Sequence, residues 1–287
     1  MLETTPIRLL KKYNIRPLKR LGQSFLVDVN IIEKIIMTAK LEKEDIVVEI
    51  GAGIGVMTAL IAKIVKNIIA VELDRFMIEI LQAELSDRSN IQIMEQDILQ
   101  LDFSRLRLDM KLPRVKVVGN IPYNISSPIL FHLLEHKEHF LSIIVMLQKE
   151  VAERLIATPG TKAYGTLSVI FAMYFEISKQ FNIPSKCFYP QPKVDSTVLR
   201  MIVRKKPLMA LKNPELFRYI VRLAFGHRRK TLFNNIKNSD LISFTSPREV
   251  STILENIGIN GERRGETLTV EEFGHLSNAL FDKITEI

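Results

Sequence analysis

The sequence predicts an α/β protein in which a parallel-sheet domain is followed by a smaller all-helical domain. Short apolar runs alternate with helical patterns between about residues 30 and 150, which is typical of βαβ units. These runs are almost entirely apolar rather than alternating, as expected for strands that are buried on both faces. The pattern becomes helical throughout after Lys205, Lys206 and Pro207, so we place a domain boundary near residue 206.

The expected strands and helices of the first domain follow one another in regular order. The strand candidates are Ile46–Ile50, Ile68–Glu72, Ile91–Glu95, Val115–Gly119 and Ile143–Leu147. The helix candidates are Ile31–Ala39, Met57–Ile64, Phe76–Leu85 and Ser127–Leu134. A later pair of runs, Phe175–Phe181 and Thr197–Arg204, flanks a proline-punctuated loop and could close the sheet as antiparallel edge strands.

The last part of the chain is expected to form helices. The candidates are Pro214–Gly226, Arg229–Ile236, Pro247–Asn256 and Val270–Phe281. Ser246 before Pro247 supplies a cap residue and a proline at the first helical position. Thr269 and Glu272 have the spacing of a capping box. We therefore divide the chain into a basic arm (1–21), an α/β domain (22–205) and a helical domain (206–287).

The composition is that of a globular protein with an excess of positive charge. Of the 287 residues 47% are hydrophobic, which is too apolar for a disordered chain, and the net charge is +8. A single cysteine, Cys187, excludes a disulfide framework and cysteine-rich zinc modules. No apolar run is long enough for a membrane span or a secretory signal. We expect a cytoplasmic protein with a polyanionic partner, no membrane and no metal.

Positive charge gathers in two segments. The arm carries Arg8, Lys11, Lys12, Arg16, Lys19 and Arg20 against Glu3 alone. It could follow a phosphate backbone or be a solvated terminus, and its prolines argue against one continuous helix. The second cluster consists of Arg218, Arg222, Arg228, Arg229 and Lys230. Phosphate contact is the favoured interpretation of this cluster, and a solvated helix face is the alternative.

A glycine turn follows the first expected strand. Gly51, Gly53 and Gly55 stand between strand and helix, where glycine lets the backbone approach a ligand closely. Glu72 ends the next strand and can accept hydrogen bonds from ribose hydroxyls. Val56 occupies the place of the third small residue of a dinucleotide fingerprint, which disfavours a dehydrogenase. S-adenosylmethionine, which has no phosphate, is therefore the expected cofactor.

Two further segments at strand ends complete the expected site. Asp97 could accept the exocyclic amine of the cofactor's adenine, although an acid there is more often a helix cap. After the fourth strand, Asn120 and the Ile121 carbonyl could hold both hydrogens of an adenine amine and aim its lone pair at a methyl group. Pro122 fixes the loop, and Tyr123 offers a ring on which an extruded base can stack. The alternative is an Asx turn before a proline.

Asn120-Ile121-Pro122-Tyr123 after Gly51-Ala52-Gly53 resembles the amino-methyltransferases that depend on S-adenosylmethionine. More narrowly, the chain resembles the KsgA (RsmA) family of bacterial small-subunit rRNA adenine dimethyltransferases over nearly its whole length. The motifs are Leu21-Gly-Gln-Ser-Phe-Leu26, Phe188-Tyr-Pro-Gln-Pro-Lys-Val-Asp-Ser196 and Ala224-Phe-Gly-His-Arg-Arg-Lys-Thr-Leu232. The family usually has asparagine where Ser24 stands.

The resemblance implies roles for individual residues and an activity. It implies cofactor contacts for Ser24, Leu26, Gly51, Gly53, Glu72, Asp97 and Asn120. It also implies that Asn120 and Tyr123 hold the target base while Phe188 stacks on its other side. The implied reaction is transfer of two methyl groups to N6 of each of two adjacent adenines in a hairpin loop near the 3′ end of 16S rRNA. The implied partner is a partly assembled small ribosomal subunit, and a monomer is expected.

Three other functions compete with this interpretation. The erythromycin-resistance methyltransferases, which modify large-subunit rRNA, share the first motifs. Ser126-Ser127-Pro128 and the length of chain after Lys230 favour the small-subunit group. A non-catalytic ribosome assembly or transcription factor on the same scaffold is disfavoured by the intact Asn120 loop and Glu72. A dehydrogenase is disfavoured by Val56.

Overall fold

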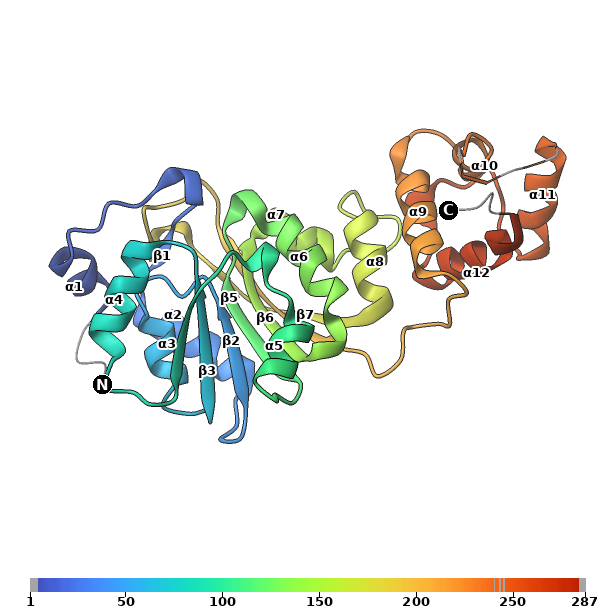
Figure 1. The fold of residues 1–287 in the computed structure, drawn as a ribbon. Helices are drawn as coiled ribbons and strands as arrows, with labels where there is room; N and C mark the ends of the chain where they lie inside the picture. The colour runs from blue at the N-terminus through green and yellow to red at the C-terminus, as the bar shows by residue number, and fades with distance from the viewer. Residues whose placement is uncertain (1–4, 240, 243, 245, 284–287) are drawn as a thin grey trace. The chain divides into compact units, whose positions relative to one another are not determined.

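The computed structural model describes residues 5–239, 241–242, 244 and 246–283 (Figure 1). The chain divides into two compact units, which we call the sheet unit (1–152 and 177–203) and the helical unit (153–176 and 204–287). The predicted boundary near residue 206 lies close to the last crossing between the units, at 203/204. Residues 153–176, expected in the α/β domain, belong to the helical unit because α8 (Thr166–Tyr174) packs against α9 (Pro214–Gly226).

The sheet unit contains a seven-stranded sheet with the order β4-β3-β2-β5-β6-β9-β7. The strands are β2 (Ile46–Ile50), β3 (Asn67–Glu72), β4 (Ile91–Glu95), β5 (Val115–Asn120), β6 (Phe140–Gln148), β7 (Phe175–Ile183) and β9 (Ser196–Val203). The pairs from β4 to β6 are parallel, and β9 is antiparallel to β6. The chain order reverses between β2 and β5, so their carboxyl ends flank the crevice in which ligands of such sheets bind.

Most strands are buried on both faces, as their composition predicts. Val47 and Val118 lie on one face of the sheet, and their neighbours Val48 and Val117 lie on the other, all with at most 1% exposure. The expectation of a buried strand is wrong for β4, which is only partly buried. Because β4 forms the edge of the sheet, its side chains have a strand neighbour on one side alone.

Helices α2 (Val29–Ala39), α3 (Val56–Ile61) and α4 (Arg75–Leu85) share one apolar cluster with the sheet. Helix α3 begins where Gly55 adopts a φ of +77°. A Cβ atom on Gly55 would lie 2.7 Å from Leu81 Cδ2, so the close approach of the turn to α4 requires glycine here. Helices α5 (Phe103–Asp109) and α6 (Ser126–Glu135) follow β4 and β5 in the chain, and α5 was not predicted.

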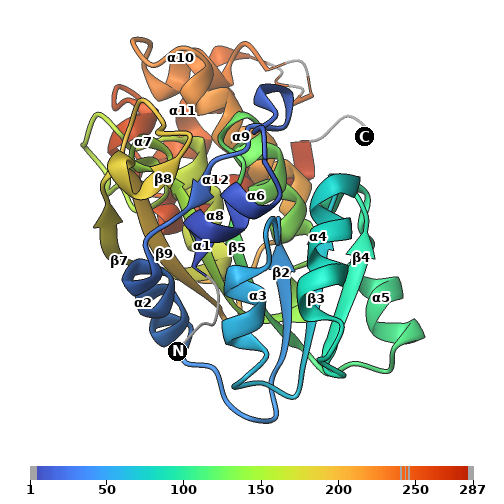
Figure 2. The same cartoon turned by 90° about the vertical axis from the view of Figure 1, so that its left-hand side faces the viewer.

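The basic arm is docked on the sheet unit. It forms α1 (Pro6–Lys12) and a short 3-10 turn, η1 (Lys19–Leu21), and the break between them agrees with the prolines. Leu9, Leu10 and Ile15 are buried in the same apolar cluster as α2, which lies near α1 in Figure 2. Lys12 pairs with Glu84 of α4 at 2.5 Å. A solvated terminus is therefore the wrong interpretation of the described arm residues, because apolar side chains hold them in place.

The helical unit is built from α8, α9, α10 (Leu232–Ile236), α11 (Pro247–Asn256) and α12 (Val270–Leu280). The Thr269–Glu272 capping box at the start of α12 is confirmed. Helix α10 begins at Leu232 rather than at Arg229, because the Thr231 side chain accepts a hydrogen bond from the Asn234 amide and caps it. None of the helices that the structure describes is long and apolar enough to cross a membrane.

Candidate active site

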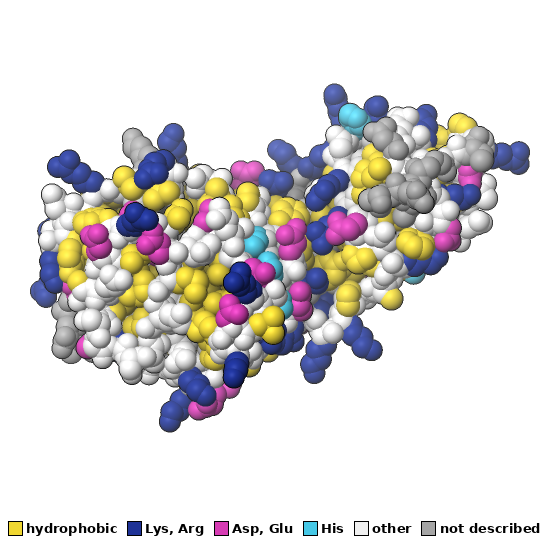
Figure 3. Space-filling view, viewed as in Figure 1, with side chains coloured by type: hydrophobic (Ala, Val, Ile, Leu, Met, Phe, Trp, Pro, Cys, Tyr) yellow, Lys and Arg dark blue, Asp and Glu magenta, His cyan; other side chains and the backbone are white. Residues whose placement is uncertain are grey.

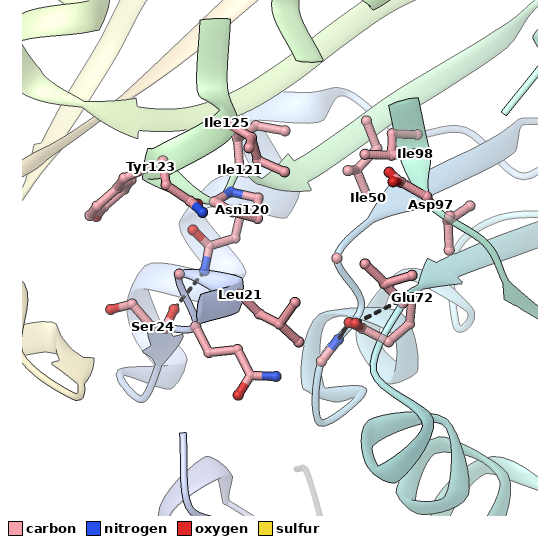
Figure 4. A pocket seen from close by; sticks show the side chains of 18 of the residues that line it. Leu21, Ser24, Ile50, Glu72, Asp97, Ile98, Asn120, Ile121, Tyr123 and Ile125 are labelled. Carbon is pink, nitrogen blue, oxygen red and sulfur yellow. Dashed lines mark hydrogen bonds between the residues drawn. The ribbon is translucent and has the colours of Figure 1, made fainter. Parts of the chain in front are cut away.

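A cavity of about 290 Å³ opens at the carboxyl ends of the central strands of the sheet unit (Figure 4). Five segments line it, and each carries part of the predicted site. They are Arg20–Phe25, the glycine turn with Ile50, Gly51 and Gly53, Val71–Leu73, Gln96–Leu99, and Asn120–Ile125. Segments up to a hundred residues apart meet here because parallel strands end at the same edge of the sheet.

The glycine turn has the conformation that its composition predicts. Gly51 has a φ of +71° and Gly53 a φ of +55°, in the region that other residues rarely adopt. A Cβ atom on Gly53 would lie 3.3 Å from the Phe25 ring, and one on Gly51 would point at the Asn120 carbonyl, 3.6 Å away. Because these two positions carry no side chain, a ligand can lie directly against the backbone of the turn.

Glu72 is fixed by backbone amides at the bottom of the cavity. Its Oε2 accepts from the Gly53 amide at 2.8 Å, and its Oε1 accepts from the amides of Leu73 and Asp74 at 2.8 and 3.0 Å. Three of the four lone-pair positions of the carboxylate are thus occupied, and one remains for a ligand. Burial raises the pKa of Glu72, and the three amide hydrogen bonds oppose this shift.

Asp97 lies in the cavity wall after β4. Its Oδ1 accepts from the Leu99 amide at 2.9 Å and caps a short 3-10 turn, η2 (Ile98–Gln100). The helix-cap interpretation of this residue is therefore correct. Because a carboxylate has a second oxygen, the cap leaves acceptor capacity that a ligand amine could use.

The side chain of Asn120 has a defined orientation. Its Nδ2 donates a hydrogen bond to the backbone carbonyl of Ser24 at 2.9 Å, drawn as a dashed line in Figure 4. An amide has two donors on nitrogen and an acceptor on oxygen, so this bond fixes Oδ1 as the atom presented elsewhere. Oδ1 is the atom required to accept a hydrogen bond from an exocyclic amine.

Tyr123 lines the cavity, and its hydroxyl bonds to a residue that does not line it. The hydroxyl makes a short hydrogen bond with Oγ of Ser196, a fully buried residue at the start of β9. Burial raises the pKa of Tyr123, and the Ser196 hydrogen bond opposes the shift. A phenol that is neutral and already bonded is suited to holding a ring in place rather than to proton transfer.

The loop between Asn120 and Tyr123 is fixed by the neighbouring strand and turn. The Ile121 amide donates to the Met146 carbonyl at 3.2 Å, and Ser126 Oγ donates to the Tyr123 carbonyl at 3.2 Å. Pro122 has a φ of −56°, and the turn η3 (Tyr123–Ile125) leads directly into α6. The sheet and α6 therefore hold the loop rigidly from both ends.

Two predicted site residues are placed elsewhere. Leu26 and Phe188 are paired across the short strands β1 (Phe25–Leu26) and β8 (Phe188–Tyr189). Their side chains are only 6% and 3% exposed and belong to the apolar core. Among the described residues neither lines the cavity. The structure therefore does not bring these two side chains to the site, because the β1–β8 pairing turns them inward.

Ser24 lines the cavity, but its hydroxyl and its carbonyl already have partners. Its hydroxyl donates to the Pro190 carbonyl at 3.0 Å, and its own carbonyl accepts from Asn120. Its backbone therefore orients Asn120, a role that no side-chain motif could indicate. Gln23, which was not among the predicted site residues, also lines the cavity and bonds to Asp74. Its position inside the Leu21–Leu26 motif was the available signal.

The predicted phosphate-binding cluster separates into two groups in the helical unit. Arg218 is only 15% exposed and pairs with Glu215. Arg228 donates to the carbonyls of Lys162 and Tyr164 and pairs with Glu266 at 2.8 Å, so it crosslinks two loops of the unit. Arg228 is itself partly exposed, with 43% of its side chain accessible, but these contacts fix it. Arg222, Arg229 and Lys230 are exposed as well and form the second group. Figure 3 shows Lys and Arg side chains spread over the visible surface rather than in a single patch.

Three of the five histidines lie together although no ligand pattern was predicted. The rings of His132 and His136 are 4.8 Å apart, and that of His139 is 5.9 Å from His136. Burial lowers the pKa of His136, and the neighbouring histidines add to this effect. Among the described residues no group of three or more His, Cys, Asp or Glu could hold a metal ion.

The geometry defines the class of protein. In the turn after β2 the Gly53 amide is bound to Glu72, which keeps one acceptor position open, and Asp97 keeps another. These acceptors fit the ribose and the amine of a nucleoside cofactor. Together with the strand order they fit a Rossmann-like, S-adenosylmethionine-dependent methyltransferase. Comparison with known proteins then identifies the family. The chain belongs to the ribosomal RNA adenine dimethylase family, whose profile matches residues 15–280.

Curated relatives and solved structures agree with this assignment. The chain is 40% identical over 273 residues to the ribosomal RNA small subunit methyltransferase A of Syntrophus aciditrophicus, covering 95% of this chain and 97% of the relative. It is 42% identical over 277 residues to that of Clostridioides difficile, covering 96% and 95%.

Two crystal structures resemble the fold. A dimethyladenosine transferase from Plasmodium falciparum has a TM-score of 0.74 and 26% identity, covering 87% of this chain and 94% of that one. The 23S rRNA methyltransferase ErmE has a TM-score of 0.67 and 26% identity, covering 90% and 99%.

Proposed function

We propose that this enzyme transfers methyl groups from S-adenosylmethionine to N6 of two adjacent adenines near the 3′ end of 16S rRNA. The substrate is the assembling small ribosomal subunit in the cytoplasm, and the enzyme acts as a monomer. The observation that carries the proposal is the orientation of Asn120, whose Nδ2 is held by the Ser24 carbonyl so that Oδ1 accepts from the target amine. The relatives named small subunit methyltransferase A support the choice of substrate.

The cofactor would lie against the glycine turn. Gly51 and Gly53 allow its close approach, the open lone pair of Glu72 accepts a ribose hydroxyl, and the second oxygen of Asp97 accepts the adenine amine. From its position at the end of a strand, Glu72 is expected to accept hydrogen bonds from both ribose hydroxyls. The three backbone amides on its carboxylate leave one direct contact. S-adenosylmethionine supplies a methyl group on a sulfonium centre.

The target adenine would be turned out of its RNA stack into the same cavity. Its exocyclic amine is a poor nucleophile because the lone pair is delocalised into the ring. Asn120 Oδ1 and the Ile121 carbonyl accept its two hydrogens, which favours a more tetrahedral nitrogen with the lone pair directed at the methyl group. Tyr123 provides the stacking surface. The proton leaves to water after transfer, so no strongly shifted base is required.

Exposed cations would bind the RNA backbone. They are Arg222, Arg229 and Lys230 in the helical unit and Arg8, Lys11, Arg16 and Arg20 in the arm. Lysine and arginine side chains on the surface bind phosphates without sequence preference, so they set affinity and register, while the cavity selects the base.

The decisive experiment incubates the enzyme and labelled S-adenosylmethionine with unmethylated small subunits, and separately with large subunits. We expect label in 16S rRNA only, at two adjacent adenines as N6-dimethyladenine. The structural likeness to ErmE makes methylation of 23S rRNA the second candidate, and label in the large subunit would establish it. The N120A variant, which should transfer no label, controls for contaminating activity. Absence of label from both particles would refute the proposal.

A further inference from the structure

Leu18–Ser24, which we call the strap, connects the docked arm to β1, and its residues Arg20–Ser24 line one side of the active-site cavity. Gln23 lines the cavity and bonds to two residues that do not line it. Its Nε2 donates to Asp74 Oδ2 at 2.6 Å, and its Oε1 accepts from the Leu18 amide at 2.8 Å. One side chain thus folds the strap on itself and joins it to the turn after β3.

Asp74 lies next to the cofactor wall. Its Oδ1 caps α4 by accepting from the Phe76 amide at 3.0 Å, and its own amide donates to Glu72 Oε1 at 3.0 Å. The strap is therefore fastened to the backbone turn that holds the Glu72 carboxylate. The hydrogen bond from Gln23 to a carboxylate is charge-assisted and partly buried, which makes it one of the stronger kinds.

The other end of the strap contacts the base-binding loop. The Ser24 carbonyl accepts from Asn120 at 2.9 Å. Gly22 has a φ of +64°, and a Cβ atom there would lie 2.5 Å from Asn124 Oδ1, so the strap packs tightly against this loop. The strap therefore touches both the turn that would hold the cofactor and the side chain that would hold the base.

We propose that Gln23 is a positioning residue that latches the strap over the cofactor cavity and thereby fixes the Ser24 carbonyl that orients Asn120. This inference rests on the proposed use of S-adenosylmethionine. The hydrogen bond to Asp74 holds the strap against the turn that carries Glu72, and the same strap presents the Ser24 carbonyl to Asn120. Cofactor binding and base binding are therefore coupled through this side chain.

The hydrogen-bond polarity of the latch permits a swap experiment. Q23E places two carboxylates face to face. In D74N the oxygen at position 74 still accepts from Phe76 and the Gln23 oxygen still accepts from Leu18, so two NH2 groups face each other. Each single variant therefore loses the hydrogen bond between positions 23 and 74. In the double variant Q23E/D74N the new carboxylate at position 23 accepts from the Leu18 amide and from the new amide at position 74. That amide's oxygen still caps α4, the net charge is unchanged, and asparagine caps about as well as aspartate.

Binding of S-adenosylhomocysteine to the full chain is measured by calorimetry, without RNA. We expect Q23A, Q23E and D74N each to weaken binding by about tenfold, and the swap to recover it to within about threefold of wild type. Without ligand, the Leu21–Ser24 amides should exchange hydrogen faster in the single variants than in the wild type. In the double variant Q23E/D74N their exchange rate should return to that of the wild type. K12Q, which removes the ion pair between arm and α4 without touching the cavity, should leave both readouts unchanged.

Methyl transfer supplies a third readout. With saturating cofactor the single variants should still transfer more slowly, because the Ser24 carbonyl is less firmly placed, and the swap should restore the rate. The proposal would be overturned if the single variants bound S-adenosylhomocysteine as tightly as the wild type. It would also be overturned if the double variant Q23E/D74N bound no more tightly than the single variants. Failure of the proposed function would instead appear as unmethylated rRNA with normal exchange and binding in the wild type.

Discussion

Asn120 Nδ2 lies 2.9 Å from the backbone carbonyl of Ser24, a residue 96 positions earlier in the chain. This hydrogen bond determines which atom of the Asn120 amide is presented to a substrate. Because the partner is a backbone atom, this hydrogen bond does not require a particular side chain at position 24. The orientation depends on the path of the strap, not on the Ser24 side chain.

The N120D substitution should nearly abolish methyl transfer. It keeps the shape of the side chain but sets a carboxylate oxygen against the Ser24 carbonyl, so the residue is repelled from its productive position. We expect single-turnover transfer to unmethylated small subunits to fall about 100-fold. S24A keeps the carbonyl and serves as the matched control, with a rate within about threefold of wild type. Wild-type transfer by N120D would contradict the assigned role.

The hydroxyl of Tyr123 should act through Ser196 and not in the chemistry. Y123F and S196A each remove the same hydrogen bond, so we expect each to slow transfer by less than about tenfold and the double variant to be no slower. Y123A also removes the stacking surface and should cost a further factor of about 10 to 100. If Y123F were as slow as Y123A, the hydroxyl itself would take part in transfer.

Replacement of Glu72 should weaken cofactor binding. E72Q loses a carboxylate that accepts from three amides, and its new NH2 group opposes one of them. We expect the affinity for S-adenosylhomocysteine to fall by about 2 kcal/mol, or about 30-fold, in calorimetry. E95Q changes the residue in register with Glu72 on the edge strand, outside the cavity, and should bind as wild type. Equal affinities in both variants would remove Glu72 from the site.

The two groups of basic residues in the helical unit should behave differently. R228A breaks the hydrogen bonds to Lys162, Tyr164 and Glu266, so we expect it to destabilise the protein by about 1–3 kcal/mol in thermal or urea unfolding. The triple variant R222A/R229A/K230A should unfold as wild type. It should instead reduce the slope of log affinity for small subunits against log salt by about one per cation removed. An unchanged slope would make these cations an ordinary solvated surface.

Stability should fall with rising pH because of Glu49. This β2 residue is 2% exposed, and burial raises its pKa to about 8 against a hydrogen bond from Thr58 that lowers it. The folded state therefore holds a proton that the unfolded state releases near pH 4.5. The stabilisation is complete below that pH and is lost as the pH rises through about 8.

E49Q should remove this dependence, since a neutral amide cannot lose a proton. We expect E49Q to gain more than about 1 kcal/mol of stability relative to wild type between pH 5 and pH 9, measured by urea unfolding without cofactor. Glutamine keeps an acceptor for Thr58, so packing is matched at low pH. Parallel stability curves for the two proteins would show that Glu49 is ionised throughout.

Much of the sheet unit could be predicted from local patterns. Ile46–Ile50 and Ile91–Glu95 were predicted with the bounds that the structure has, because apolar runs between turn residues mark strands directly. The helix α8 was missed, since it is apolar nearly all round and has no helical stripe. Short helices such as α5 were missed because seven residues give little periodicity.

The sequence by itself determined the glycine turn, the acidic residue after β3 and the Asn120–Tyr123 loop, because these depend on residue type and on position beside a strand. Only the tertiary structure decided that Arg228 is an internal crosslink, that Leu26 and Phe188 face the core, and that residues 153–176 join the helical unit. It alone showed the Asn120–Ser24 and Gln23–Asp74 hydrogen bonds. The physical reason is that a side chain's role depends on partners from distant segments, and folding, not local pattern, brings those partners within hydrogen-bonding distance.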